Sequence, residues 1–272
     1  MFDYINRDTK LCMSLSARPG NVGTRFHNYL YREMGLNYVY KAFSTESLKD
    51  AIAGIRGLNI RGCAISMPFK ESVIELLDEL MPSAATIGSV NTIVNDEGWL
   101  RAYNTDYAAV RSLLDNHNVS RDMSYVIQGS GGMAKAVAIA MRDAGFQKGT
   151  ILARNEAAGR SLAELCGVEW QTDLRNLKPQ ILVNVTPIGM AGGIEANDLA
   201  FSQEAVEATQ VVFDVVALPA ETPLIKLARG LGKSVITGAE VMTLQAVEQF
   251  VLYTGQRPTQ ELIAKAAVYS RA

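Results

Sequence analysis

Two short stretches of this sequence hold residue types that could carry chemistry, and the first is a pair of glycines behind an apolar run. In YVIQGSGGMAKA the spacing Gly129-x-Gly131-x-x-Ala134 is that of a dinucleotide-binding fingerprint. Glycines let the backbone approach a pyrophosphate, and a helix N-terminus supplies unpaired N–H groups and a positive dipole. Because the stretch leaves a predicted strand and opens a predicted helix, we interpret it as a nucleotide site and not as a plain structural turn.

The end of the next predicted strand indicates which nucleotide binds. An NAD site usually has an acidic residue about 20 residues beyond the glycines, which binds the ribose hydroxyls. Here the chain has Ala153-Arg154-Asn155 at that place. The guanidinium of Arg154 suits a 2′-phosphate by its charge and by its fork of donors. Glu156 lies two residues further on and weakens the signal, so the residues favour NADP and leave NAD open.

The second stretch is CAISMPFKES, residues 63–72, in which Lys70 follows a small-residue strand and a proline. A lysine in the first turn of a helix is usually a solvated charge, and the stretch by itself indicates no more. Held at the end of a strand, the ammonium could instead stabilise negative charge on an oxygen and donate its proton. Asp106 could assist, but its place before an apolar helical stripe also suits an N-cap.

Strands and helices alternate in the first hundred residues. Apolar periodicity predicts strands at 10–16, 38–44, 62–67, 89–94 and 99–104, and helices over 24–35, after the predicted N-cap Thr45, and from Pro68 through Ile74, Leu77 and Leu80. The turn-rich residues 95–98 predict a hairpin between the last two strands. Ser14 and Ser16 are one residue apart on a strand, so they share a face.

From Ser124 the alternation becomes regular. Apolar runs at 124–128, 149–155, 181–186, 211–216 and 233–238 are separated by helical segments, which indicates a parallel sheet covered on both faces. Residues 239–272 are predicted to be helical with a break near Gly255 and Pro258, to add no strand, and to pack on the first half. We predict two α/β domains, 1–105 with 239–272 and 106–238, with the active site in the cleft between them.

Composition excludes several classes of protein. The chain has 272 residues and a formal net charge of −2, which gives no electrostatic reason to expect a nucleic-acid or membrane partner. Its three cysteines are scattered without metal-ligand spacing, so we expect no metal and a reducing compartment. The start MFDYINRDTK has no signal-peptide pattern, and a cytoplasmic location is the simpler expectation.

Several short stretches, in order along nearly the whole chain, resemble the shikimate dehydrogenase family. They are Ser14-Leu15-Ser16, His27-Asn28, Ser66-Met67-Pro68-Phe69-Lys70, Ser89-Val90-Asn91-Thr92, Asn104-Thr105-Asp106, Ala153-Arg154-Asn155, Asn184-Val185-Thr186-Pro187-Ile188-Gly189-Met190, Thr222-Pro223-Leu224 and Leu244-Gln245-Ala246. The resemblance implies a two-domain enzyme in which a Rossmann-like, NADP-binding parallel sheet accompanies an α/β substrate-binding domain. Such an enzyme reversibly reduces the ketone of 3-dehydroshikimate with a nicotinamide cofactor.

The resemblance also implies roles for individual residues. Lys70 and Asp106 correspond to the catalytic pair that flanks the reacting oxygen. The substrate-binding residues would be Ser14, Ser16, Ser66, Asn91 and Gln245, with the two N-terminal serines on the substrate carboxylate. The cofactor-binding residues would be Gly129, Ser130, Gly131, Gly132, Met133, Ala134, Arg154, Thr186 and Gly238. His27 has no chemical task in the family and is expected to be structural.

The sequence departs from the family at three informative positions. A substrate-binding Asn-Val-Thr appears here as Ala64-Ile65-Ser66, an expected tyrosine is Ala217, and an expected second glycine after Gly238 is Glu240. These changes predict a divergent, shikimate dehydrogenase-like branch. The loss of the amide and of the tyrosine predicts an efficiency toward shikimate that is lower by about one to three orders of magnitude.

Three functions therefore stay open. The first is the oxidation of shikimate, and the second is the same chemistry on quinate or an aminated shikimate analogue. The third is a ligand-sensing module without turnover, against which the retention of Lys70 and Asp106 argues. A monomer and a homodimer are both compatible with the sequence.

Overall fold

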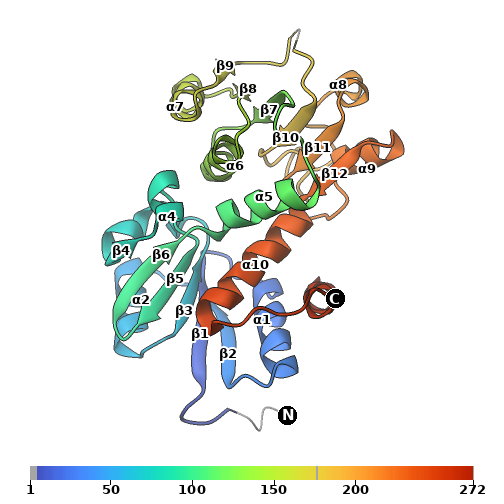
Figure 1. The fold of residues 1–272 in the computed structure, drawn as a ribbon. Helices are drawn as coiled ribbons and strands as arrows, with labels where there is room; N and C mark the ends of the chain where they lie inside the picture. The colour runs from blue at the N-terminus through green and yellow to red at the C-terminus, as the bar shows by residue number, and fades with distance from the viewer. Residues whose placement is uncertain (1–4, 176, 272) are drawn as a thin grey trace. The chain divides into compact units, whose positions relative to one another are not determined.

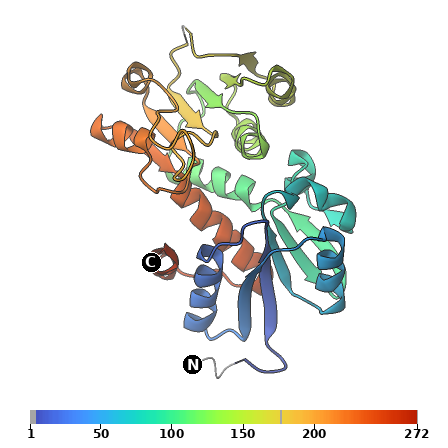
Figure 2. The same cartoon turned by 180° about the vertical axis from the view of Figure 1, so that it is seen from behind.

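The structure is a computed structural model that describes residues 5–175 and 177–271, and it shows an α/β protein with two six-stranded sheets (Figures 1 and 2). The chain divides into two compact units. Unit 1 holds the chain up to Thr105 together with the part from Thr243 onward, and unit 2 is Asp106–Met242. The second border lies inside helix α10 (Gly238–Thr254), whereas the sequence placed it at the start of that helix.

The sheet of unit 1 is mixed. Its strands are β1 (Lys10–Leu15), β2 (Tyr38–Phe43), β3 (Gly62–Ile65), β4 (Glu79–Leu80), β5 (Thr92–Asp96) and β6 (Trp99–Tyr103), in the order β2-β1-β3-β5-β6-β4. β1 is parallel to β2 and β3, while β5 is antiparallel to β3 and β6. The carboxyl ends of β1, β3 and β6 and the start of β5 therefore lie along one edge of the sheet.

The predicted hairpin joins β5 and β6. Asp96 pairs with Trp99, so the loop consists of Glu97 and Gly98, both with positive φ (55° and 95°). Two consecutive positive φ angles are typical of the tight hairpin turn that matches the twist of the strands.

Helices cover both faces of the unit-1 sheet. They are α1 (Val22–Glu33), α2 (Leu48–Gly57), α3 (Phe69–Ser72), a 3-10 turn (Ile74–Leu76), α4 (Pro82–Ile87), α10 and α11 (Gln260–Arg271). One core contains Met13 and Ile65 with Ile52 of α2, and the other contains Tyr40 with Phe26 of α1 and Phe250 of α10. The C-terminal segment thus adds no strand and packs on the first half of the chain, as the sequence predicted.

Two local predictions in unit 1 are wrong. The helix expected after Pro68 ends at Ser72, and its apolar residues continue in the 3-10 turn and in β4. Ile74, Leu77 and Leu80 still pack on the core, although Ile74 lies in the 3-10 turn, Leu77 is the extended residue after it and Leu80 belongs to β4. Ser47, and not Thr45, caps α2, since the Ser47 hydroxyl accepts a hydrogen bond from the Asp50 N–H.

The sheet of unit 2 is fully parallel. Its strands are β7 (Tyr125–Gln128), β8 (Gly149–Leu152), β9 (Glu169–Gln171), β10 (Ile181–Asn184), β11 (Val211–Asp214) and β12 (Ser234–Thr237), in the order β12-β11-β10-β7-β8-β9. Its helices are α5 (Thr105–Asn116), α6 (Gly132–Asp143), α7 (Glu156–Cys166), α8 (Gln203–Ala208) and α9 (Pro223–Gly230).

The strand order of unit 2 reverses direction beside β7, because β8 lies on one side of it and β10 on the other. In open parallel sheets, ligands bind outside the carboxyl ends of the strands at such a switch point. The topology therefore places a ligand site beyond Gln128 and Asn184. Within the described part of the chain, none of the helices is long and apolar enough to cross a membrane.

Candidate active site

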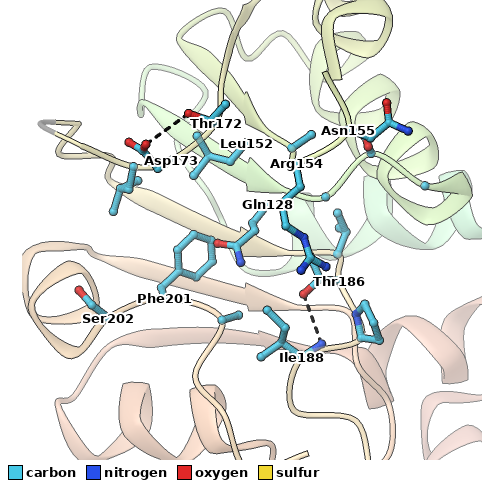
Figure 3. Close-up of a pocket in the computed structure, with 18 residues that line it drawn as sticks. Gln128, Leu152, Arg154, Asn155, Thr172, Asp173, Thr186, Ile188, Phe201 and Ser202 are labelled. Carbon is cyan, nitrogen blue, oxygen red and sulfur yellow. Dashed lines mark hydrogen bonds between the residues drawn. The ribbon is translucent and has the colours of Figure 1, made fainter. Parts of the chain in front are cut away.

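A cavity of about 640 Å³ lies at the switch point of unit 2 (Figure 3). Three segments form most of its wall: 128–131 after β7, 153–155 after β8, and 185–188 after β10. Residues 172–174 after β9 and 200–202 before α8 also line it. The cavity is therefore built by the ends of adjacent parallel strands, where a nucleotide is expected.

The glycine loop requires its first glycine for two reasons. Gly129 has φ +126°, and a Cβ at this position would lie 2.8 Å from Cγ2 of Val185 and 3.2 Å from its carbonyl oxygen. Gly131 precedes α6, and a Cβ there would meet nothing within 4 Å. The loop thus combines a backbone that only glycine adopts easily with an open approach to a helix N-terminus, which suits a pyrophosphate.

Arg154 directs its side chain into the cavity toward Thr186 (Figure 3). It forms no ion pair with any residue that the structure describes. Glu156, which weakened the prediction, is bound instead by Arg160 at 2.8 Å, and the Arg160 guanidinium lies 4.3 Å from the ring centroid of Trp170. The charge of Arg154 is therefore not neutralised by its acidic neighbour.

A buried polar network fixes the loop after β10. The amide nitrogen of Asn184 donates to Asp214 at 3.0 Å, and its oxygen accepts from the N–H and hydroxyl of Thr186 at 3.0 and 2.6 Å. Asp214 also accepts a 2.6 Å bond from Thr222, the N-cap of α9. Burial raises the pKa of Asp214, against the opposing effect of these hydrogen bonds.

Sequence reasoning did not assign a role to Asn184 or Asp214 in the nucleotide site. The available signal was that the apolar runs ILVN and VVFD each end on a polar residue at the carboxyl edge of the sheet. Both side chains are fully buried, so they shape the cavity wall from behind it.

Not all predicted cofactor residues line the cavity. Gly129, Ser130, Gly131, Arg154 and Thr186 do, whereas Gly132, Met133 and Ala134 form the first turn of α6. Gly238 begins α10, where a Cβ would lie 2.4 Å from the carbonyl oxygens of Val215 and Val216. Backbone packing therefore explains why position 238 is a glycine.

Glu240, the departure after Gly238, completes a capping box at the start of α10. Its carboxylate accepts from the Thr237 N–H and hydroxyl at 2.8 and 2.7 Å and lies 2.9 Å from Nε2 of His117. Burial acts to raise the pKa of Glu240, but the hydrogen bonds from Thr237 and the contact with His117 outweigh it and lower that pKa. The glutamate thus supplies the side-chain half of the capping box, which a glycine could not supply.

In unit 1, backbone hydrogen bonds gather predicted site residues at one edge of the sheet. Ser66 N–H donates to Leu15 O at 3.0 Å, Ile65 N–H to Asn91 O at 2.8 Å, and Val90 N–H to Lys70 O at 2.8 Å. These bonds connect the residues after β1 and β3 with the segment before β5. Ser16, Ser66, Lys70 and Asn91 consequently lie along the same edge.

Ser14 sits in a row across this sheet. It pairs with Ala64 on β3, and Ala64 pairs in turn with Thr92 on β5. Burial raises the pKa of Tyr40, and a hydrogen bond with Ser14 acts in the opposite direction. The methyl group of Ala64 therefore separates two hydroxyl-bearing side chains.

Lys70 is half-buried as the second residue of α3, so it is not a fully solvated surface charge. Asp106 is 4% exposed and is the second residue of α5, which rules out the N-cap position because the helix already begins at Thr105. Gln245 is half-buried on α10. Lys70 and Gln245 belong to unit 1 and Asp106 to unit 2, and the pairing of lysine with aspartate stays a prediction.

The fold and the nucleotide cavity define a Rossmann-type dinucleotide-binding protein with a second α/β unit. The family model "Shikimate dehydrogenase substrate binding domain" matches residues 22–93. A shikimate dehydrogenase-like protein of Haemophilus influenzae is 56% identical over 267 residues, covering 98% of each chain. A shikimate dehydrogenase (NADP(+)) of Halothermothrix orenii is 34% identical, covering 85% of this chain and 86% of the relative.

Solved structures agree with these relatives. Shikimate 5-dehydrogenase of Thermus thermophilus, in complex with NADP(H) and shikimate, superposes with a TM-score of 0.86 at 26% identity, covering 96% of this chain and 99% of the other. Quinate dehydrogenase of Corynebacterium glutamicum, in complex with NAD, gives 0.85 at 27% identity, covering 96% and 98%. The chain belongs to the shikimate dehydrogenase family, and the expected resemblance to its "-like" branch is confirmed.

Proposed function

We propose that this protein is an NADP-dependent oxidoreductase that reversibly oxidises shikimate or a close hydroxy-acid analogue. The observation that carries the proposal is the edge of the unit-1 sheet, where an ammonium group, an amide and two hydroxyls lie together on Lys70, Asn91, Ser16 and Ser66. An edge with one cation and several neutral hydrogen-bonding groups suits a small polyhydroxylated acid.

The cofactor assignment is supported by unit 2. The glycine loop leaves backbone room for a pyrophosphate, and Arg154 offers an unneutralised charge for a 2′-phosphate. Two relatives named above are NADP proteins or complexes, and a third binds NAD. A bound nicotinamide supplies the hydride acceptor for alcohol oxidation. Residues of unit 2 hold the phosphates of the cofactor, and residues of unit 1 contact the reacting oxygen of the substrate.

Lys70 is proposed as the general acid and base. Its ammonium stabilises negative charge on the substrate oxygen and exchanges a proton with it. Asp106 is proposed to orient the ammonium and to assist the proton's passage, since a carboxylate accepts hydrogen bonds from an ammonium and this one is only 4% exposed. Ser14 and Ser16 are proposed to hold the substrate carboxylate.

A substrate and cofactor panel tests this proposal. Purified protein is mixed with shikimate or quinate and with NADP or NAD, and the absorbance of the reduced nicotinamide is followed. We expect turnover with shikimate and NADP, and slower turnover with NAD. No turnover with any combination would contradict the enzyme assignment and favour the ligand-sensing alternative.

Quinate is the second candidate substrate. The observation that favours it is Ala64, because a methyl group between Ser14 and Thr92 leaves more room on the sheet edge than a side-chain amide would. Faster turnover of quinate than of shikimate in the same panel would establish this alternative.

A further inference from the structure

The side-chain amide of Asn91 has a fixed orientation. Its Oδ1 accepts a 2.8 Å hydrogen bond from the backbone N–H of Thr105, and a backbone N–H can only donate. The hydroxyls of Thr92 and Thr105 donate to the same oxygen at 2.8 and 3.2 Å. The oxygen end of the amide therefore faces Thr105, because a flipped amide would place its own N–H donors against the Thr105 N–H, which can only donate.

The other end of the same amide is the nitrogen atom Nδ2. Asn91 is 2% exposed, and its Nδ2 is buried without a hydrogen-bond partner among the residues that the structure describes. A buried, unpaired N–H donor is costly, so a group that accepts from it gains more than an ordinary surface contact would.

A second amide, that of Gln249 on α10, fixes the hydroxyl of Thr92. Its Nε2 donates to the backbone oxygen of Asn91 at 3.3 Å and to Oγ1 of Thr92 at 3.1 Å. A backbone carbonyl can only accept, so the nitrogen end of Gln249 must face it. Because Thr92 accepts from Gln249, its own proton is directed to Asn91.

The hydroxyl of Thr92 links the two amides. It accepts from Nε2 of Gln249 and donates to Oδ1 of Asn91, so the donors point one way, from Gln249 through Thr92 to Asn91.

We propose that this chain of hydrogen bonds makes Asn91 an obligate donor, with Gln249 and Thr92 as positioning residues. The substrate group that meets Asn91 is then an oxygen that accepts, a hydroxyl or a carbonyl. An ammonium group at that position is rejected. The proposal deepens the proposed function and rests on it, because it assumes that the sheet edge of unit 1 is the substrate site.

The physical basis is that two hydrogen-bond donors cannot pair with each other. An ammonium has three N–H donors and no acceptor, so against Asn91 it would bury donors facing donors. A site built to pair one polarity rejects the opposite polarity more strongly than it rejects a group that is merely absent. Replacement of the substrate hydroxyl that meets Asn91 by an amine should therefore weaken binding more than its replacement by hydrogen.

The test uses shikimate analogues in which each ring hydroxyl is replaced in turn by an amine or by hydrogen. Dissociation constants are measured by calorimetry at pH 7, where an aliphatic amine is protonated. At one ring position we expect the amino analogue to bind at least about tenfold more weakly than the deoxy analogue. Equal binding of the two analogues at every position would overturn the proposal.

Asn91→Asp reverses the polarity with little change in shape. We expect the order to invert at that ring position, so that the amino analogue binds more tightly than the deoxy analogue. An unchanged order in Asn91→Asp would show that another group selects the substituent, and the proposal would be wrong.

Gln249→Met tests the positioning role, with Gln260→Met on the exposed start of α11 as the matched control. We expect Gln249→Met to raise KM for shikimate more than it lowers kcat and to reduce the discrimination between amino and deoxy analogues. A purely structural role would lower Tm and leave that discrimination intact, which would contradict the positioning assignment.

Failure of the proposed function has a different signature. If the unaltered protein neither binds nor turns over shikimate or any oxygen-bearing analogue, the substrate assignment falls, and the preference argued here falls with it. If it turns over shikimate while the amino and deoxy analogues bind alike, the enzyme assignment stands and the role of Asn91 as an obligate donor is wrong.

Discussion

The two candidate sites, one in each unit, are built in different ways. The cavity of unit 2 is made by consecutive residues at the ends of neighbouring strands, and its defining feature is a backbone that glycine permits. The sheet edge of unit 1 is made by side chains from separate strands and a C-terminal helix. Gln249 reaches Asn91 across 158 positions of sequence. A local sequence motif can therefore predict a site like that of unit 2, whereas the residues of a site like that of unit 1 come together only in the folded chain.

The largest effect is expected from Lys70→Ala, which would place the chemistry in unit 1. Loss of the ammonium should cut kcat by about a hundredfold or more, while the dissociation constant of NADPH changes little. Lys49→Ala is the matched control, because Lys49 is likewise the second residue of a helix but is exposed. Normal kcat in Lys70→Ala would return this lysine to the class of surface charges.

Arg154→Ala should show the next largest effect, and it isolates the charged part of the unit-2 site. Loss of a charge-assisted contact should weaken NADPH binding by about tenfold to a hundredfold, with NADH nearly unaffected. Fluorescence titration of both nucleotides measures the ratio. Equal losses for the two nucleotides would mean that Arg154 does not bind the 2′-phosphate.

Substitutions at Gly129 and Gly131 distinguish the effect of backbone strain from the effect of blocking the approach of the ligand. Gly129→Ala should lower the free energy of unfolding by about 1–3 kcal/mol, because it combines a positive φ with a collision against Val185. Gly131→Ala should leave Tm unchanged, since its Cβ meets nothing, yet weaken NADPH binding by about tenfold. A Gly131→Ala variant with unchanged nucleotide affinity would place the pyrophosphate elsewhere.

Ser14→Ala and Ser16→Ala should have the smallest effects. Each removes one hydrogen bond to the substrate carboxylate, so KM for shikimate should rise about threefold to tenfold with little change in kcat. Steady-state kinetics on each variant measures both constants. A fall in kcat with KM unchanged would contradict a role in ground-state binding.

Much of unit 2 could be predicted from the sequence. Its strands are short apolar runs between helices, and the glycine pattern fixes where the chain turns from β7 into α6. Arg154 could be found because its distance from the glycines is set by one strand-helix-strand repeat. No role in the nucleotide site was predicted for Asn184 or Asp214, because they shape the cavity wall through a hydrogen bond to each other across neighbouring strands.

Unit 1 was less predictable from the residues alone. The helix after Pro68 was overestimated because its apolar residues, three apart in the sequence, reach one core from a 3-10 turn, an extended residue and a short strand. Thr45 looked like a helix cap, but its hydroxyl binds the backbone of Ser47, which caps instead. The substrate edge was named only through the family resemblance, and no local pattern reports the orientation of the Asn91 amide.

Hydride transfer itself can be followed with shikimate that carries deuterium at the carbon whose hydroxyl becomes the ketone. The protein is incubated with this shikimate and NADP, and the reduced cofactor is analysed by mass spectrometry. The account predicts that the deuterium moves to the nicotinamide ring and that turnover slows relative to unlabelled shikimate. Unreduced NADP, with all deuterium still on bound shikimate, would contradict the assignment of this protein as a dehydrogenase.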